Sequence, residues 1–157
     1  MAESNRKTLE HIEQFGCTVF HVGEEGELPP FSYSVGITKT AAAPEVVVVG
    51  LKQKLAHFMV NEYHLRVRAG ERFQHGLRYA GFLEGFEVEA RNVNHFFYDD
   101  YFGQCLRFYE DRSFDVIQLI YPNKQGIWPW QAEADDWFKS WQPILATAPT
   151  SHKRPRK

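Results

Sequence analysis

The chain has 157 residues, of which 43% are hydrophobic and 15% aromatic, enough for one domain with a substantial core. No apolar window is long enough to span a bilayer, and the N-terminus lacks the apolar stretch of a signal peptide. Two cysteines are too few for a disulfide framework or a cysteine-based metal site, so we expect two reduced thiols in a cytoplasmic protein.

The charge is unevenly distributed along the chain. The formal net charge is −2, but four of the 18 basic residues lie in the last five positions. Without those four, 14 basic residues stand against 20 acidic ones, a net charge of −6, which argues against a nucleic-acid-binding face on the body. We therefore predict a single domain over residues 1–148 and a disordered basic tail over residues 149–157.

In the first part of the chain, helix and strand patterns alternate. Ser4 can cap a helix that Gly16 ends, and a strand is expected over residues 17–22. Residues 31–37 alternate large side chains with two serines and a glycine, which leaves room for a backbone or a ligand on the small-residue face. Residues 38–44 are expected to form a loop, and the aliphatic run Glu45–Val49 a central strand.

The clearest helix pattern covers residues 51–69, with Gly70 as its stop. At about 100° per residue, one apolar stripe results, which we expect to face the core. Its members are Leu51, Leu55, Phe58, Leu65 and Ala69. Glu62 lies within this stripe, while His57 and His64 lie on the opposite, polar side, where we predict no metal site.

The second half predicts further strands and one aromatic helix. Residues 86–90 alternate as a strand, and 115–121 form the last clear strand. Asn94 can cap a helix whose shared face consists of Phe97, Tyr101, Cys105 and Phe108. Four tryptophans between residues 128 and 141 surround a short helical turn, where they form core packing, a lid over the sheet, or an aromatic partner-binding pocket.

Two polar residues within strands are candidates for chemistry. Gln118 shares a side with Val116 and Ile120, where its amide bonds a loop backbone or orients a ligand. Glu45 follows Pro44 at the mouth of a buried strand, where it serves as a base, as a ligand acceptor, or as a structural acceptor for backbone N–H groups. The chain has no phosphate-binding glycine loop, nucleophile elbow or zinc motif, so no cofactor and no metal are predicted.

Several segments together resemble the bacterial domain-of-unknown-function family 4262. They are Phe31–Ile37, Pro44–Leu51, Asn61, Gly70, Gln118–Asn123, Gly126, Pro129–Trp130 and Gln142–Leu145, so the similarity runs from about Gly16 to Leu145. Family members usually carry Trp then Pro-Asp where this chain has Tyr121-Pro122-Asn123, and often Phe where Trp128 stands. The resemblance implies a shared fold and a bacterial cytosolic origin, and it implies no reaction.

These observations predict an α+β domain, with a twisted, mostly antiparallel sheet flanked by about three helices. We expect a non-enzymatic binding or interaction module, of an accessory or immunity type, whose partner is another protein rather than a membrane or a nucleic acid. The alternative is a small hydrolase-type enzyme with a polar pocket at the sheet edge. Because strand ends converge in one sheet, we predict that Tyr33, Glu45, Gln118 and Trp130 line that pocket.

Overall fold

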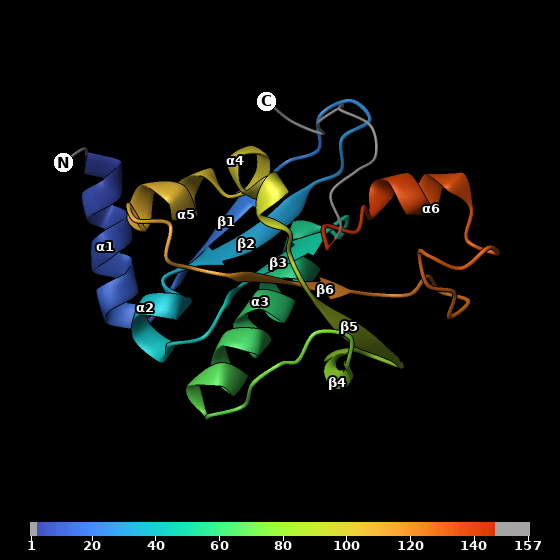
Figure 1. Cartoon of the computed structure of the whole chain (residues 1–157), viewed down its shortest axis with the longest axis horizontal. Coiled ribbons are helices and arrows are strands. Elements are labelled where there is room, and N and C mark those ends of the chain that lie inside the picture. Colours follow the sequence, from blue (N-terminus) through green and yellow to red (C-terminus); the bar gives the residue numbers. More distant parts are fainter. Residues whose placement is uncertain (1–2, 147–157) are drawn as a thin grey trace.

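The structure, a computed structural model, describes residues 3–146, with side chains from residue 6 onward (Figure 1). The predicted tail over 149–157 lies outside these residues. The strands are β1 (Thr18–Val22), β2 (Phe31–Val35), β3 (Glu45–Val49), β4 (Arg78–Leu83), β5 (Phe86–Asn92) and β6 (Val116–Ile120). The helices are α1 (Glu3–Phe15), α2 (Ile37–Ala41), α3 (Gln53–Arg68), the 3₁₀ turn η1 (His95–Phe97), α4 (Tyr98–Tyr101), α5 (Gly103–Phe108) and α6 (Asp136–Trp141).

The six strands form one sheet in the order β1-β2-β3-β6-β5-β4. Only β3 and β6 pair in parallel, so the prediction of a mostly antiparallel α+β sheet is confirmed. The expected number of about three helices is too low, since the described residues contain six α-helices. The aromatic segment predicted as one helix is broken into η1, α4 and α5, because Phe102 leaves helical geometry at φ −116° and ψ 46°.

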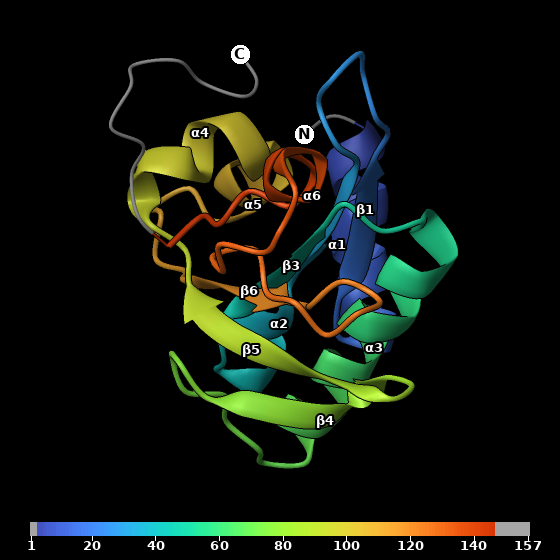
Figure 2. The ribbon, with the colours of Figure 1, turned by 90° about the vertical axis from the view of Figure 1, so that its right-hand side faces the viewer.

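Helices cover both faces of the sheet. In Figure 1 α3 lies below the sheet, and α4 and α5 lie above it. Figure 2, turned by 90°, shows α3 on the same side of the molecule as β1. The lower core joins α3 to Val46 and Val48, and the upper, aromatic core joins α4 and α5 to Val47 and Val49. Because alternate residues of β3 enter different cores, both faces of the strand are buried, and its sequence after Glu45 is an unbroken aliphatic run.

The small residues of β2 make room for α3. Ser32 and Ser34 are buried, and they alternate with Phe31, Tyr33 and Val35, which belong to the upper core. Serine at these positions lets the helix backbone approach the sheet, because a serine side chain extends little from the strand. The room predicted from the sequence is thus occupied by the protein's own helix.

The direction that α3 faces differs from the prediction. The buried residues are Ala56, Met59, Val60, Tyr63, His64 and Val67, whereas Leu55, Phe58 and Leu65 are exposed. The helix has two apolar sides, and the side with Ala56, Met59, Val60, Tyr63 and Val67 packs against the valine-rich sheet. The predicted core stripe is therefore wrong for Leu55, Phe58 and Leu65, whereas Leu51 packs against the lower core as predicted.

The segment after β2 also differs from the prediction. The strand ends at Val35, and residues 37–41, expected as strand end and loop, form the helix α2. Gly36 makes the turn with a φ of 114°, and a Cβ atom there would lie 2.8 Å from the side chain of Ile12. Both features require glycine. Among the described residues, no helix is long and apolar enough to cross a membrane.

Candidate functional site

Glu45 begins β3 with its side chain fully buried and its carboxylate surrounded by donors. It accepts hydrogen bonds from three peptide N–H groups at the start of α2 and from two hydroxyl groups. The donors are N–H of Gly36 (3.1 Å), Ile37 (3.2 Å) and Thr38 (3.0 Å), the hydroxyl of Ser34 (2.7 Å) and the hydroxyl of Tyr109, which makes a short bond. We call these five donors and Glu45 the Glu45 cradle.

The cradle explains why a carboxylate is tolerated in the core. Burial raises the pKa of Glu45, and the hydrogen bonds from Tyr109, Thr38, Ser34 and Gly36 act in the opposite direction by stabilising the anion. The donors come from β2, α2 and the residue after α5, so the carboxylate joins three elements. Of the three roles open to Glu45, the structural acceptor for backbone N–H groups is therefore confirmed.

Tyr33 lies near the same part of the upper core. Its ring is buried, and its hydroxyl accepts a hydrogen bond of 3.0 Å from the peptide N–H of Gln104 on α5. Tyr109, the hydroxyl donor to Glu45, follows the same helix. The structure therefore ties Tyr33 and Glu45 to the two ends of the Gln104–Tyr109 segment.

The side chain of Gln118 bonds the backbone of the connection that follows α6. Its amide donates to the carbonyl of Pro143 at 2.9 Å, and its carbonyl accepts from the N–H of Leu145 at 2.8 Å. The predicted bond to a loop backbone is thus confirmed. Both functional groups of the amide are engaged by this connection, which holds residues 143–145 over the upper core.

Trp130 belongs to a stack of four side chains. Its ring stacks on Trp128 with centroids 5.3 Å apart, the Arg91 guanidinium lies 4.1 Å from the centroid of the Trp130 ring, and the Arg78 guanidinium lies 4.2 Å from that of Trp128. The buried carboxylate of Glu89 bonds both arginines, at 3.2 Å to Arg78 and 2.6 Å to Arg91. Each ring thus lies against a guanidinium group, a favourable arrangement, and Trp130 keeps 38% of its surface exposed.

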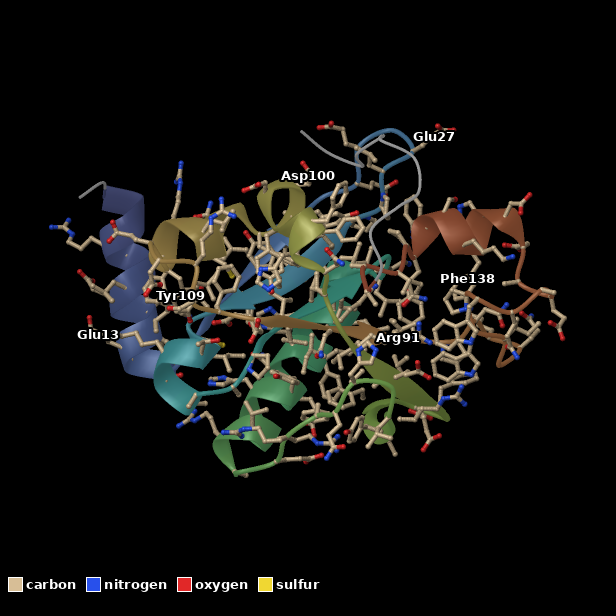
Figure 3. The ribbon with its side chains drawn as sticks, viewed as in Figure 1. Glu13, Glu27, Arg91, Asp100, Tyr109 and Phe138 are labelled. Atoms are coloured by element: carbon tan, nitrogen blue, oxygen red, sulfur yellow. The ribbon has the colours of Figure 1, made fainter. Side chains whose placement is uncertain are left out.

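The four predicted residues therefore form two pairs. Tyr33 and Glu45 both contact the Gln104–Tyr109 segment, while Gln118 pairs across the ladder with Arg91, which stacks on Trp130. Figure 3 shows Tyr109 beside α1 and Arg91 in another part of the molecule.

Two cavities of about 560 Å³ each lie next to α2. The first is bounded by α1, α2 and the chain from α5 to β6, and we call it the α1–α5 cavity. It is lined by Thr8, Leu9, Lys39, Gln104, Arg107, Phe108, Tyr109, Glu110, Asp111 and Ser113. The second follows the connection from α2 to β3 toward Asp115. None of the four predicted residues lines either cavity, although Tyr109 connects the first to Glu45.

The two thiols are free and buried, which confirms that they are unpaired. Burial raises the pKa of Cys17 to about 12 and that of Cys105 well above its usual value. The Cys17 sulfur lies 3.3 Å from Nδ1 of His64, whose own pKa is lowered by burial and by Arg68. A thiol with so high a pKa is a poor nucleophile, so this contact is a packing feature.

A second histidine contact lies at the other end of β1. His21 Nδ1 is 2.6 Å from the Ser32 hydroxyl, and His21 Nε2 is 3.1 Å from His57 Nδ1. Burial and His57 lower the pKa of His21. The prediction that His57 and His64 lie away from the core is right for His57, which is exposed, and wrong for His64, which is buried. In the part of the chain that the structure describes, no three His, Cys, Asp or Glu side chains are grouped to hold a metal.

The outer face of α3 carries three large apolar side chains. The exposed fractions of Leu55, Phe58 and Leu65 are 38%, 51% and 60%, and Glu62 lies among them. The sequence pattern identified these residues as one stripe and assigned them to the core. The signal was therefore present in the sequence, but a helix with two apolar sides does not reveal which side is buried.

Asn123, at a position where the family resemblance implies aspartate, has a local role. Its side-chain oxygen accepts hydrogen bonds from the N–H groups of Gln125 (2.9 Å) and Ile127 (3.0 Å), which closes the turn after β6. An aspartate carboxylate can accept the same two bonds. This departure from the family pattern thus preserves the turn.

Comparison with known proteins gives one match. No curated protein and no solved structure matches the chain. A family model described as a domain of unknown function, DUF4262, matches residues 11–135, which include all six strands and α3. Because this match covers well over half of the chain, the protein belongs to the DUF4262 family.

Proposed function

We propose that this protein is a non-enzymatic interaction module, of an accessory or immunity type, that binds a partner protein through the outer face of α3. The observation that carries the proposal is the line of Leu55, Phe58 and Leu65, each at least 38% exposed, on the longest helix described. Large apolar side chains grouped in this way are typical of recognition surfaces, and helix-spaced anchors suit a helical partner.

The charges around this line favour an acidic partner. Arg66 is paired with Glu71, so the remaining charges within Gln53–Arg68 are those of Lys54, Arg68 and Glu62, a net charge of +1. The chain up to residue 152 carries a net charge of −6, so α3 is a basic element on an acidic body. We therefore propose an amphipathic and acidic partner segment, because opposite charges around an apolar contact speed association and select the partner.

A second copy of this chain fits the surface less well. Antiparallel packing of two α3 helices about the middle of the stripe places Lys54 of each copy opposite Arg68 of the other. Like charges at such positions destabilise a helix pair. The basic character of α3 thus supports a different protein as the occupant.

The polar groups that a hydrolase would use support the same conclusion. The Glu45 carboxylate and the Gln118 amide are engaged within the fold, and the high pKa of both thiols disfavours the thiolate nucleophile. We also place the protein in the bacterial cytoplasm, a proposal supported by its two free, buried thiols.

The test uses two synthetic helical peptides that share leucines at helix spacing and differ only in glutamate or lysine on the flanks. Fluorescence anisotropy with the full chain should show saturable binding of the acidic peptide and at least about tenfold weaker binding of the basic one. A variant with Leu55, Phe58 and Leu65 changed to serine should lose the binding.

Leu77→Ser provides a matched control, because Leu77 is 49% exposed and lies outside α3. It should bind the acidic peptide as the unchanged protein does. Equal binding of both peptides, binding that survives the triple serine change, or no binding of the acidic peptide would overturn the proposal.

A further inference from the structure

The α1–α5 cavity lies on the upper side of the sheet, away from α3 and independent of the proposed docking face. Its volume of about 560 Å³ is within the usual range for small-molecule sites. Its walls come from α1, α2 and the chain that joins α5 to β6. Figure 3 shows Tyr109 where these elements meet.

The walls carry charges of both signs that the fold leaves unpaired. Lys39 and Arg107 line the cavity, and neither forms an ion pair with any residue between 6 and 146. Glu110 likewise has no ion pair there, and Asp111 accepts hydrogen bonds from the N–H and hydroxyl of its neighbour Ser113. The cavity thus presents two cations and two carboxylates and has no net formal charge.

The cradle holds the floor of this cavity in place. Tyr109 donates its hydroxyl proton to buried Glu45 and accepts a bond of 3.3 Å from the peptide N–H of Lys39. These two contacts fix α2 against the end of α5, so Lys39 and Arg107 project from anchored elements. A site built on anchored elements loses less entropy when a ligand binds.

We infer that this cavity binds a small zwitterion of the amino-acid class, either a free amino acid or a dipeptide. Lys39 and Arg107 provide donors for a carboxylate, and guanidinium groups suit carboxylate geometry well. Glu110 and Asp111 provide acceptors for an ammonium group. Leu9 and Phe108 supply apolar wall for a hydrocarbon side chain. A ligand with only one charge would leave one pair of wall charges without a partner.

Three probes with a similar hydrocarbon skeleton test this inference. The full chain is titrated with L-leucine, with 4-methylpentanoate, which lacks the ammonium group, and with 3-methylbutylamine, which lacks the carboxylate. L-leucyl-L-leucine is added as a larger zwitterion. Amide chemical shifts of residues 104–113 should respond saturably to leucine or the dipeptide, with at least about tenfold weaker affinity for both singly charged analogues.

Exposed wall residues provide the matched variants. Arg107→Ala should reduce the preference for the zwitterion over 3-methylbutylamine, and Glu110→Gln should reduce the preference over 4-methylpentanoate, each by about fivefold or more. Lys124→Ala and Glu87→Gln, on exposed positions outside the cavity, should change neither preference.

Failure of both zwitterions to bind, or equal affinity for zwitterion and analogues, would overturn the inference. The variant with serine at positions 55, 58 and 65 separates it from the proposed function. That variant should keep the amino-acid response while losing the acidic peptide, since the two surfaces share no residue.

Discussion

The Glu45 cradle and the outer face of α3 contrast in how their side chains are satisfied. In the cradle, a carboxylate in the core meets five donors from three parts of the chain. On α3, Leu55, Phe58 and Leu65 are 38%, 51% and 60% exposed among the residues that the structure describes. Glu45, which stands out in the sequence because it is polar, is thus bonded within the fold. The residues that look like ordinary core instead form the surface that we propose binds a partner.

The largest expected loss of stability comes from removing the carboxylate of the Glu45 cradle. Glu45→Leu leaves the N–H groups of Gly36, Ile37 and Thr38 without their acceptor, so the free energy of unfolding should fall by about 3–5 kcal/mol. Urea denaturation measures the loss. Glu87→Gln, on an exposed position of β5, should stay within about 0.5 kcal/mol of the unchanged protein. A Glu45→Leu protein of undiminished stability would remove the structural role assigned to the carboxylate.

Neighbouring residues on α3 sharpen the contrast between its two sides. Met59 is fully buried, so Met59→Ala should cost about 2–5 kcal/mol through lost packing and a residual cavity. Phe58 is half exposed, and Phe58→Ala should cost less than about 1 kcal/mol. Thermal and urea denaturation of the two variants in parallel provides the comparison. Similar losses for both would show that Phe58 is covered in solution.

A smaller loss of stability is expected from changing Gln118, because the amide and the backbone groups that it bonds are uncharged. Gln118→Leu removes the partners of the Pro143 carbonyl and the Leu145 N–H, and stability should decrease by about 1–3 kcal/mol. Gln125→Leu, in the exposed turn after β6, is the matched control and should change stability by less than about 0.5 kcal/mol. Unchanged or increased stability of Gln118→Leu would instead favour a ligand-orienting amide.

The smallest expected effect is a pH dependence from His21 and His64. Burial lowers the pKa of both side chains in the folded protein, with added contributions from His57 and Arg68 respectively. An unfolded histidine takes up its proton near pH 6.5, before the folded protein does. Stability from these groups is thus complete above about pH 6.5 and is lost as the pH falls toward the lower folded-state values.

Urea titrations between pH 8 and pH 5 measure this slope. The double variant His21→Gln, His64→Gln should lose less stability over that range than the unchanged protein, because two proton-binding groups of the unfolded state are gone. Parallel curves for the two proteins would mean that both histidines titrate alike in the folded and unfolded states.

Local sequence patterns located most elements because their causes are local. Gly16 and Gly70 adopt the left-handed conformation that ends α1 and α3, with φ of 94° and 104°. Asn94 caps the turn after β5 through a bond of 2.8 Å from the N–H of Phe96. The helix α2 escaped prediction because its first N–H groups are satisfied by Glu45, eight residues along the chain from Ile37.

The sequence by itself determined the α+β class, the aliphatic strands and the long helix, since these follow from periodicity and turn residues within short windows. Only the tertiary structure decided which side of α3 meets the sheet, because Met59 and Phe58 are both apolar and packing against β2 and β3 chooses between them. It also decided the hydrogen-bond partners of Glu45 and Gln118. The sequence shows that a strand contains a carboxylate or an amide, but it does not show which groups bond to it. Those partners, up to 64 residues away, determine whether the hydrogen bonds of the polar group stabilise the fold.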